Sequence, residues 1–153
     1  MKKNKNSPLL LENFLPYRLS YLSNIIGRRL AAIYSDKFSI APPEWKVMAH
    51  LHRFPNISAA DVTEKTALDK VAVSRAVNSL LDKGLVQRSY AREDRRRSIL
   101  NLTEQGQDIY NQIEPLVTDY ETVLLETLND TETEELDRLI TKLTQRAEVT
   151  HEG

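Results

Sequence analysis

The sequence DKVAVSRAVNSLLDKG, residues 69–84, decides the fold. Asp69 is a good N-cap, and Gly84 followed by Leu85 is typical of a helix end, where glycine is left-handed and the next apolar residue packs back. Apolar residues recur between these signals at the spacing of one helix face, which predicts a helix over 70–83 that packs on a core. The residues expected to face that core are Val73, Ala76, Val77, Leu80 and Leu81.

The opposite face of this helix carries side chains that suit the grooves of DNA. It presents Val71, Ser74, Arg75, Asn78 and Asp82, and Lys70 lies at its start. Arginine can pair with guanine O6 and N7, asparagine with adenine N6 and N7, and serine with several base edges or a phosphate. We therefore expect this face to contact DNA through Lys70 and the three polar residues of its middle turns. The alternative is an ordinary solvated helix face.

The neighbouring segments place this helix in a winged helix-turn-helix. Ser58 and Asp61 have the form of a capping box, which predicts a short helix over 58–65. After Gly84, two extended segments, 85–90 and 98–102, read as a β-hairpin. Two helices joined by about three residues and followed by a hairpin are the order of elements in this motif.

The tip of the hairpin is basic. Its arginines are Arg92, Arg95, Arg96 and Arg97. Such side chains can reach phosphates or enter a narrow minor groove while the helix occupies the major groove. Asp94 can accept hydrogen bonds from Arg96 and hold it extended. The alternative is a flexible charged turn that keeps the protein soluble.

The rest of the chain reads as long helices with apolar stripes. One is expected over 16–37, a shorter one over 43–54, a long one from 104 to about 128 that Pro115 can kink, and a last one from 131 to about 147. The predicted fold class is mainly α with a small β-hairpin wing. We expect one domain over 1–153, with the winged helix-turn-helix at about 42–102 and dimerisation helices at about 9–37 and 103–147.

Composition and charge exclude several classes of protein. The chain has 153 residues and no cysteine, so disulfides, thiol nucleophiles and cysteine-based zinc sites are excluded. Neither an 18-residue apolar run nor a secretory signal is visible, and the cytoplasm is the expected location. Residues 75–103 carry 7 basic against 3 acidic side chains, whereas residues 104–153 carry 3 against 13. A basic segment in a near-neutral chain suggests a local surface for a polyanion.

Several motifs resemble those of the multiple-antibiotic-resistance regulator (MarR) family of bacterial winged-helix transcription factors. They are Val73-Ser74-Arg75, the stretch 80–88, Asp94-Arg95-Arg96-Arg97, the stretch 102–106, and the helix start Glu44-Trp45. The usual wing pattern of the family is Asp-Pro-Arg-Asp-Arg-Arg, in which Ala91 and Glu93 here replace the first Asp and the first Arg. The segments 14–23 and 43–45 resemble the branch of the family that represses catabolism of aromatic acids, including hydroxycinnamates.

A dimer and a small-molecule effector are the partners expected besides DNA. A helix-turn-helix usually reads two half-sites, so two copies must be held at fixed spacing on a pseudo-palindromic operator. Residues 9–15 are too apolar for a free tail, and the resemblance implies that the terminal helices intertwine in a homodimer. The resemblance also implies an aromatic carboxylate bound between the dimerisation and DNA-binding regions. Candidate ligand residues are Arg18 for the carboxylate and Tyr21, Trp45 and His50 for ring and polar contacts.

Each ligand candidate has a plainer interpretation: Trp45 as core, His50 as a satisfied helix residue, and Arg18 as a surface or interface charge. An enzyme is disfavoured because His50 and His52 face different ways, and no nucleophile or phosphate-binding motif is visible. We expect no cofactor, metal or membrane partner. The sequence favours a homodimeric repressor that a hydroxycinnamate or hydroxybenzoate releases from its operator.

Two other functions stay open at this stage. One is an architectural or constitutive DNA-binding regulator without an effector, which would show weak sequence preference or no response to aromatic acids. The other is a protein-interaction member of the family that has lost operator binding. Ser74, Arg75, Asn78 and Arg96 argue against the second.

Overall fold

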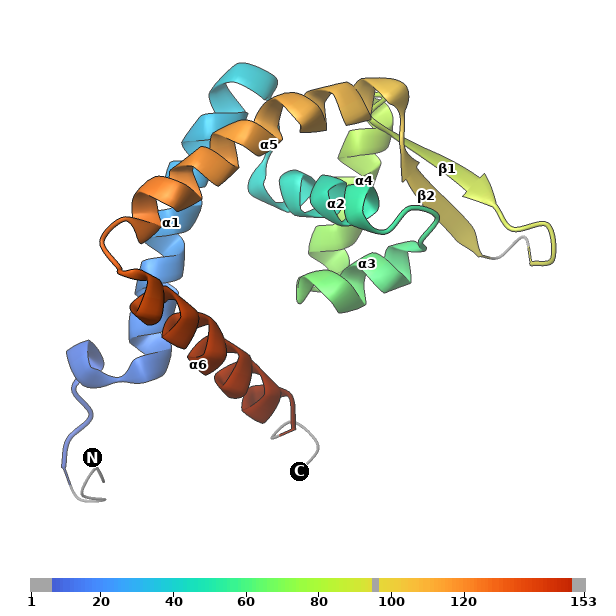
Figure 1. Ribbon diagram of the computed structural model, residues 1–153. Helices are drawn as coiled ribbons and strands as arrows, with labels where there is room; N and C mark the ends of the chain where they lie inside the picture. Colours follow the sequence, from blue (N-terminus) through green and yellow to red (C-terminus); the bar gives the residue numbers. More distant parts are fainter. Residues whose placement is uncertain (1–6, 95–96, 150–153) are drawn as a thin grey trace. The chain divides into compact units, whose positions relative to one another are not determined.

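A computed structural model describes residues 7–94 and 97–149 of the chain. The chain divides into two compact units, Met1–Glu114 and Pro115–Gly153. In the first unit lie η1 (Leu11–Asn13), α1 (Leu15–Phe38), α2 (Pro42–Arg53), α3 (Ala59–Thr66), α4 (Lys70–Asp82), β1 (Val86–Tyr90) and β2 (Ser98–Leu102) (Figure 1). Helix α5 (Glu104–Leu125) begins in the first unit, and α6 (Asp130–Val149) lies in the second. The predicted fold class, mainly α with a small β-hairpin wing, is confirmed.

The helices of the winged helix-turn-helix begin and end at the predicted caps. The Asp61 N–H donates to Ser58 Oγ at 3.1 Å, and the Ser58 N–H donates back to the Asp61 carboxylate at 3.0 Å. The Ala72 N–H donates to the Asp69 carboxylate at 2.8 Å at the start of α4. At the other end of α4, Gly84 has a φ of 72°, and the Leu85 N–H donates to the Leu80 carbonyl at 3.0 Å. These contacts satisfy the backbone groups that a helix leaves unpaired at its ends.

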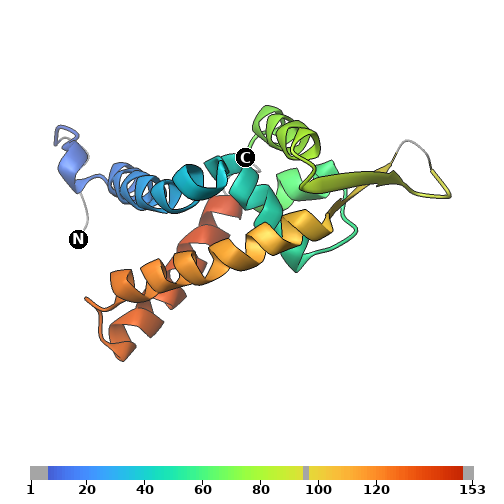
Figure 2. The same cartoon turned by 90° about the horizontal axis from the view of Figure 1, so that it is seen from above.

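The hairpin is antiparallel, with Val86 opposite Leu102 and Tyr90 opposite Ser98. It projects beyond the helices of its unit (Figure 2). Its base is fixed to the turn before α3, because the Leu100 N–H donates to the Ile57 carbonyl at 2.8 Å. The side chains of Asn56 and Asn101 also pair at 2.9 Å. The wing is therefore held at its base on the helix-turn-helix.

The core of the first unit lies between α2, α3, α4 and the hairpin. The largest fully buried side chains include Met48, Val62, Val73, Leu80, Leu100 and Ile113. Helix α4 supplies four buried residues, Val73, Ala76, Val77 and Leu80, as the sequence predicts. Leu81 was expected with them but is half-buried. The packing therefore fixes which face of α4 is turned to solvent.

Apolar side chains outside this core are exposed in the single chain. Near the N-terminus they include Leu9, Leu11, Leu15, Leu19 and Leu22, and in the second unit they include Leu139, Ile140 and Leu143. Helix α6 has no buried residue. Among the described residues, no helix is long and apolar enough to cross a membrane.

Candidate functional site

The solvent-facing side of α4 carries the predicted groove-reading residues. Lys70, Ser74, Arg75 and Asn78 are all exposed. Within the described part of the chain, no hydrogen bond or ion pair holds any of these four side chains. Val71 is 58% exposed, which is unusual for a large aliphatic side chain on a helix that buries its other face. This surface is available to a partner without breaking an internal contact.

The described part of the wing tip is also open to solvent. Arg92 and Asp94 are exposed, and the Arg97 N–H donates to the Asp94 carbonyl at 3.1 Å. The Arg97 side chain is 66% exposed, and its Nη2 lies 4.0 Å from the Asp61 carboxylate at the start of α3. Arg95 and Arg96 lie outside the described residues, so the pairing of Asp94 with Arg96 stays a prediction.

The capping box of α3 holds a carboxylate with a shifted pKa. The backbone and side-chain hydrogen bonds from Ser58, together with the charges of Arg97 and Lys65, hold the pKa of Asp61 below its ordinary value. Each of these contacts favours the charged form of the carboxyl group. The start of α3 is therefore coupled electrostatically to the tip of the wing.

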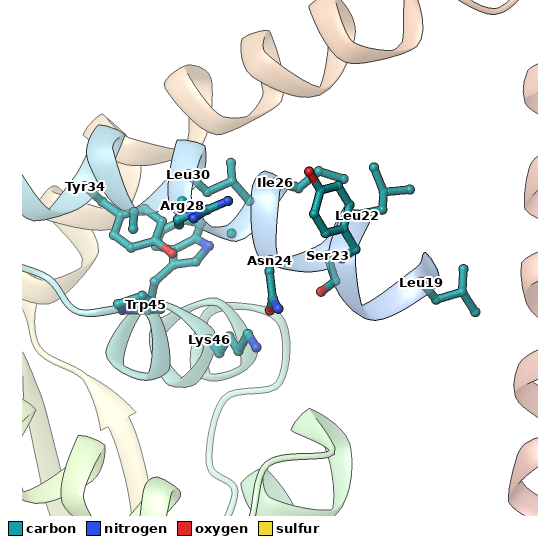
Figure 3. A pocket seen from close by; sticks show the side chains of 14 residues that line it. Leu19, Leu22, Ser23, Asn24, Ile26, Arg28, Leu30, Tyr34, Trp45 and Lys46 are labelled. Carbon is teal, nitrogen blue, oxygen red and sulfur yellow. The ribbon is translucent and has the colours of Figure 1, made fainter. Parts of the chain in front are cut away.

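An open pocket of about 980 Å³ lies along α1 and the first turn of α2. Apolar residues of α1, including Leu22, Ile26 and Leu30, form much of its lining, and Trp45 and Tyr34 form one end (Figure 3). Its cationic residues are Arg28 on α1 and Lys46 on α2. Apolar walls, aromatic rings and a cation suit a small aromatic anion.

The structure separates the four residues that the sequence suggested for a ligand. Tyr21 and Trp45 line the pocket. Arg18 instead lines a hollow of about 650 Å³ near the start of α1, together with Glu12 and Tyr17. His50 is not part of the lining, and its Nδ1–H donates to the Lys46 carbonyl at 2.8 Å. Arg28 and Lys46 were missed, because nothing in the sequence around them marks a pocket.

Sequence reasoning also missed a stack of four rings from three helices. Trp45 lies with its ring centre 5.8 Å from that of Tyr34 on α1 and 5.1 Å from that of Tyr110 on α5. The His52 ring also stacks on Tyr110, with ring centres 4.1 Å apart. Burial raises the pKa of Tyr34 and, together with the carboxylate of Glu114, that of Tyr110. Trp45 thus serves both the packing between helices and the pocket wall.

The described residues do not gather a metal site. No group of three or more His, Asp or Glu residues among them is placed to hold an ion. The features that stand out are the exposed face of α4, the projecting hairpin and the pocket.

Comparison with known proteins agrees with this geometry. Residues 38–97 match the sequence profile of the MarR family. An uncharacterized HTH-type transcriptional regulator of Bacillus subtilis, YdgJ, is 29% identical over 92 residues, which are 60% of this chain. The aligned region spans 54% of the length of that relative.

Solved structures of MarR proteins share the fold. A MarR/EmrR family regulator from Acinetobacter sp. ADP1 has a TM-score of 0.85 and 28% identity, covering 92% of this chain and 99% of its own. A mutant of MarR from E. coli, solved with operator DNA, has a TM-score of 0.77 and 27% identity, covering 90% of this chain and 99% of its own. Residues 38–97 thus match the MarR family profile, and the chain has the winged-helix fold of solved MarR-family regulators.

Proposed function

We propose that the protein is a homodimeric, sequence-specific DNA-binding repressor that a small aromatic acid, such as a hydroxycinnamate or hydroxybenzoate, releases from its operator. The observation that carries the proposal is the face of α4. Its polar side chains are exposed and unengaged among the described residues, while the opposite face is buried in the core. A helix fixed from behind in this way can enter the major groove without rearranging.

In this proposal α4 reads bases and the wing contacts the flanking DNA. Arg75 pairs with a guanine, Asn78 pairs with an adenine, and Ser74 contacts a base edge or a phosphate. Lys70 binds a phosphate at the start of the helix. The wing enters the minor groove through Arg96, which Asp94 orients, and its other arginines, Arg92, Arg95 and Arg97, neutralise phosphates.

The exposed apolar side chains of the single chain support a homodimer. Leu22 on α1 is 51% exposed and Ile140 on α6 is 53% exposed, although each belongs to an apolar stripe. A second copy would remove such stripes from water and would supply the second reading helix of a pseudo-palindromic operator. Residues at about 42–102 then read DNA, and helices within about 9–37 and 103–147 form the dimer. A regulator of this kind acts in the cytoplasm.

The pocket supports an aromatic carboxylate as the effector. Arg28 or Lys46 supplies the charge that a carboxylate requires, while Trp45, Tyr34 and Tyr21 supply ring contacts. Arg18 stays a candidate for a second position in the hollow at the start of α1, and His50 for a polar contact. The protein leaves its operator if the bound acid favours a dimer in which the spacing of the two α4 helices does not match that of the two half-sites.

The experiment is a titration of the protein against a promoter-region duplex from its own locus at fixed salt. It is repeated with a panel of hydroxycinnamates and hydroxybenzoates, and benzylamine serves as a cationic aromatic control. We expect specific binding that one or more of the acids weakens and that the amine leaves unchanged. Specific binding that no acid alters would support a constitutive regulator, and absence of specific binding would contradict the proposal as a whole.

A further inference from the structure

A buried carboxylate joins the end of α4 to the start of α2. Glu44 lies in the first turn of α2 and is only 5% exposed, which makes it the buried charged residue among those described. A buried charge is costly unless an opposite charge and hydrogen bonds compensate it. The contacts of Glu44 therefore decide whether it stabilises a particular arrangement of helices.

The hydrogen bonds that the described residues make to this carboxylate come from two places. From the turn before α2, the Ala41 N–H donates to Oε1 at 2.9 Å. From the last turns of α4, the Ser79 hydroxyl donates to Oε2 at 2.9 Å, and Lys83 Nζ lies 3.0 and 2.9 Å from the two oxygens. Lys83 Nζ also donates to the Ser39 carbonyl at 2.7 Å, which closes the cluster on the end of α1.

The cluster lies between the pocket and the face of α4 that we propose to read DNA. Pro42, Trp45 and Lys46, which flank Glu44 in the first turn of α2, line the pocket. On α4, Ser79 directly follows Asn78, and Lys83 is one turn further on. The same carboxylate is thus attached to the pocket wall through its own helix and to the reading helix through its hydrogen bonds.

Apart from Glu44, the buried residues of α2 and α4 are apolar. Apolar contacts are not directional, so they fix burial more strongly than the rotation or sliding of a helix about its axis. Charge-assisted hydrogen bonds are short and directional. The Glu44 cluster is therefore the element that can fix the register of α4 on α2.

We propose that Glu44 is a positioning residue, which holds the end of α4 to the first turn of α2 and thereby sets where Arg75 and Asn78 lie in the DNA groove. This inference rests on the proposed function. It gives Glu44 and Lys83 a role in sequence discrimination although neither side chain is proposed to touch DNA.

The test compares Glu44→Gln and Lys83→Met with a matched control, Glu132→Gln. Glu132 holds the same third position in α6 and accepts the Asn129 N–H at 3.0 Å, but it is exposed. The control therefore removes the charge of a helix cap without touching α4. Ser79→Ala removes one hydrogen bond to the carboxylate without removing a charged side chain, and it keeps the test decisive if a charge variant does not fold.

Two measurements are made on each variant. The first is the Kd for the promoter-region duplex and for a scrambled duplex of equal length at fixed salt. Because phosphate contacts dominate non-specific binding, we expect Glu44→Gln and Lys83→Met to weaken promoter binding roughly tenfold and scrambled binding about twofold or less. The second is amide exchange, which should accelerate together in segments 39–46 and 79–85. Ser79→Ala should show the same changes at smaller size, and Glu132→Gln should show neither.

Equal losses on both duplexes, or unchanged exchange in 79–85, would overturn the positioning role. Failure of the proposed function is a separate result. If the unaltered protein does not prefer the promoter duplex to the scrambled one, the proposed function is wrong, and the exchange data still decide whether Glu44 holds α4.

Discussion

The guanidinium of Arg97, where the wing returns to β2, lies 4.0 Å from the carboxylate of Asp61 in the first turn of α3. Both side chains keep much of their surface in water, so this ion pair alone contributes little to stability. Its importance is geometric, because Asp61 also accepts two hydrogen bonds from Ser58. The same carboxylate caps α3 and faces the wing.

Asp61 should make stability depend on acidity. Its pKa in the folded protein lies below the ordinary value of 3.8, mainly because of the Ser58 hydrogen bonds. Its contribution to the free energy of unfolding is therefore complete above the unfolded pKa and is lost as the pH falls through the folded pKa. We expect the free energy of unfolding to fall more steeply below about pH 4 in the unaltered protein than in Asp61→Asn. Urea unfolding at pH 7, 5, 4 and 3 measures this, with the exposed Asp82→Asn as control, and parallel curves for Asp61→Asn would contradict the assignment.

A close backbone approach should make Gly106 intolerant of any side chain. A Cβ at Gly106 would overlap the carbonyl of Leu85, whereas a Cβ at Gly27 in α1 would meet nothing within 4 Å. Gly106→Ala should therefore destabilise by about 3 kcal/mol, while Gly27→Ala should stabilise by roughly 0.5–1 kcal/mol. Thermal and urea unfolding of the two variants test the packing of α5 against Leu85, which directly precedes β1. Equal stability of Gly106→Ala and Gly27→Ala would show that the Leu85 carbonyl does not lie this close to Gly106.

The wing should contribute mainly to affinity and its salt dependence. Replacing Arg96 by alanine should weaken binding to all duplexes and lower the slope of log K against log salt by about one, because a cation in the minor groove also displaces a counterion from the DNA. Arg97→Ala serves as the comparison, since Arg97 faces Asp61, and should lower the slope less. An unchanged slope for Arg96→Ala would argue that the wing does not engage DNA.

The choice of cation in the pocket can be tested directly. Arg28 lines the pocket and Arg18 does not, so Arg28→Met should weaken binding of 4-hydroxycinnamate about tenfold or more, as expected for loss of a charged hydrogen bond. Arg18→Met should have a smaller effect. Calorimetric titration of both variants measures the difference. The reverse order would place the carboxylate in the hollow that Arg18 lines.

The elements of the fold are predictable because their ends carry local signals. Ser58, Asp69 and Gly84 each act on backbone groups within a few residues, and each does so in the structure. The predicted ends of α3 and α4, at 65 and 83, lie one residue from the observed ends at Thr66 and Asp82. Such differences are expected where the last turn of a helix is irregular.

Contacts between helices are not predictable in the same way. Glu44 and Lys83 are 39 residues apart, and each fits its own helix equally well as a solvated charge. Tyr34, Trp45 and Tyr110 likewise occupy ordinary positions in three helices and meet only when these helices pack. Which arginine of α1 reaches the pocket depends on where α2 crosses it: Arg28 lines the pocket and Arg18 lines a neighbouring hollow, and which of them binds a ligand stays a prediction.

The most direct test of the account is whether Arg75 reads a base. The affinities of the unaltered protein and of Arg75→Ala are measured for the promoter duplex and for its single base-pair variants at one salt concentration. We expect Arg75→Ala to lose about 1–3 kcal/mol of binding free energy at one position in each half-site, where the variant protein no longer discriminates between bases. A uniform loss on all duplexes would contradict it, because Arg75 would then be a phosphate contact and α4 would not read sequence through it.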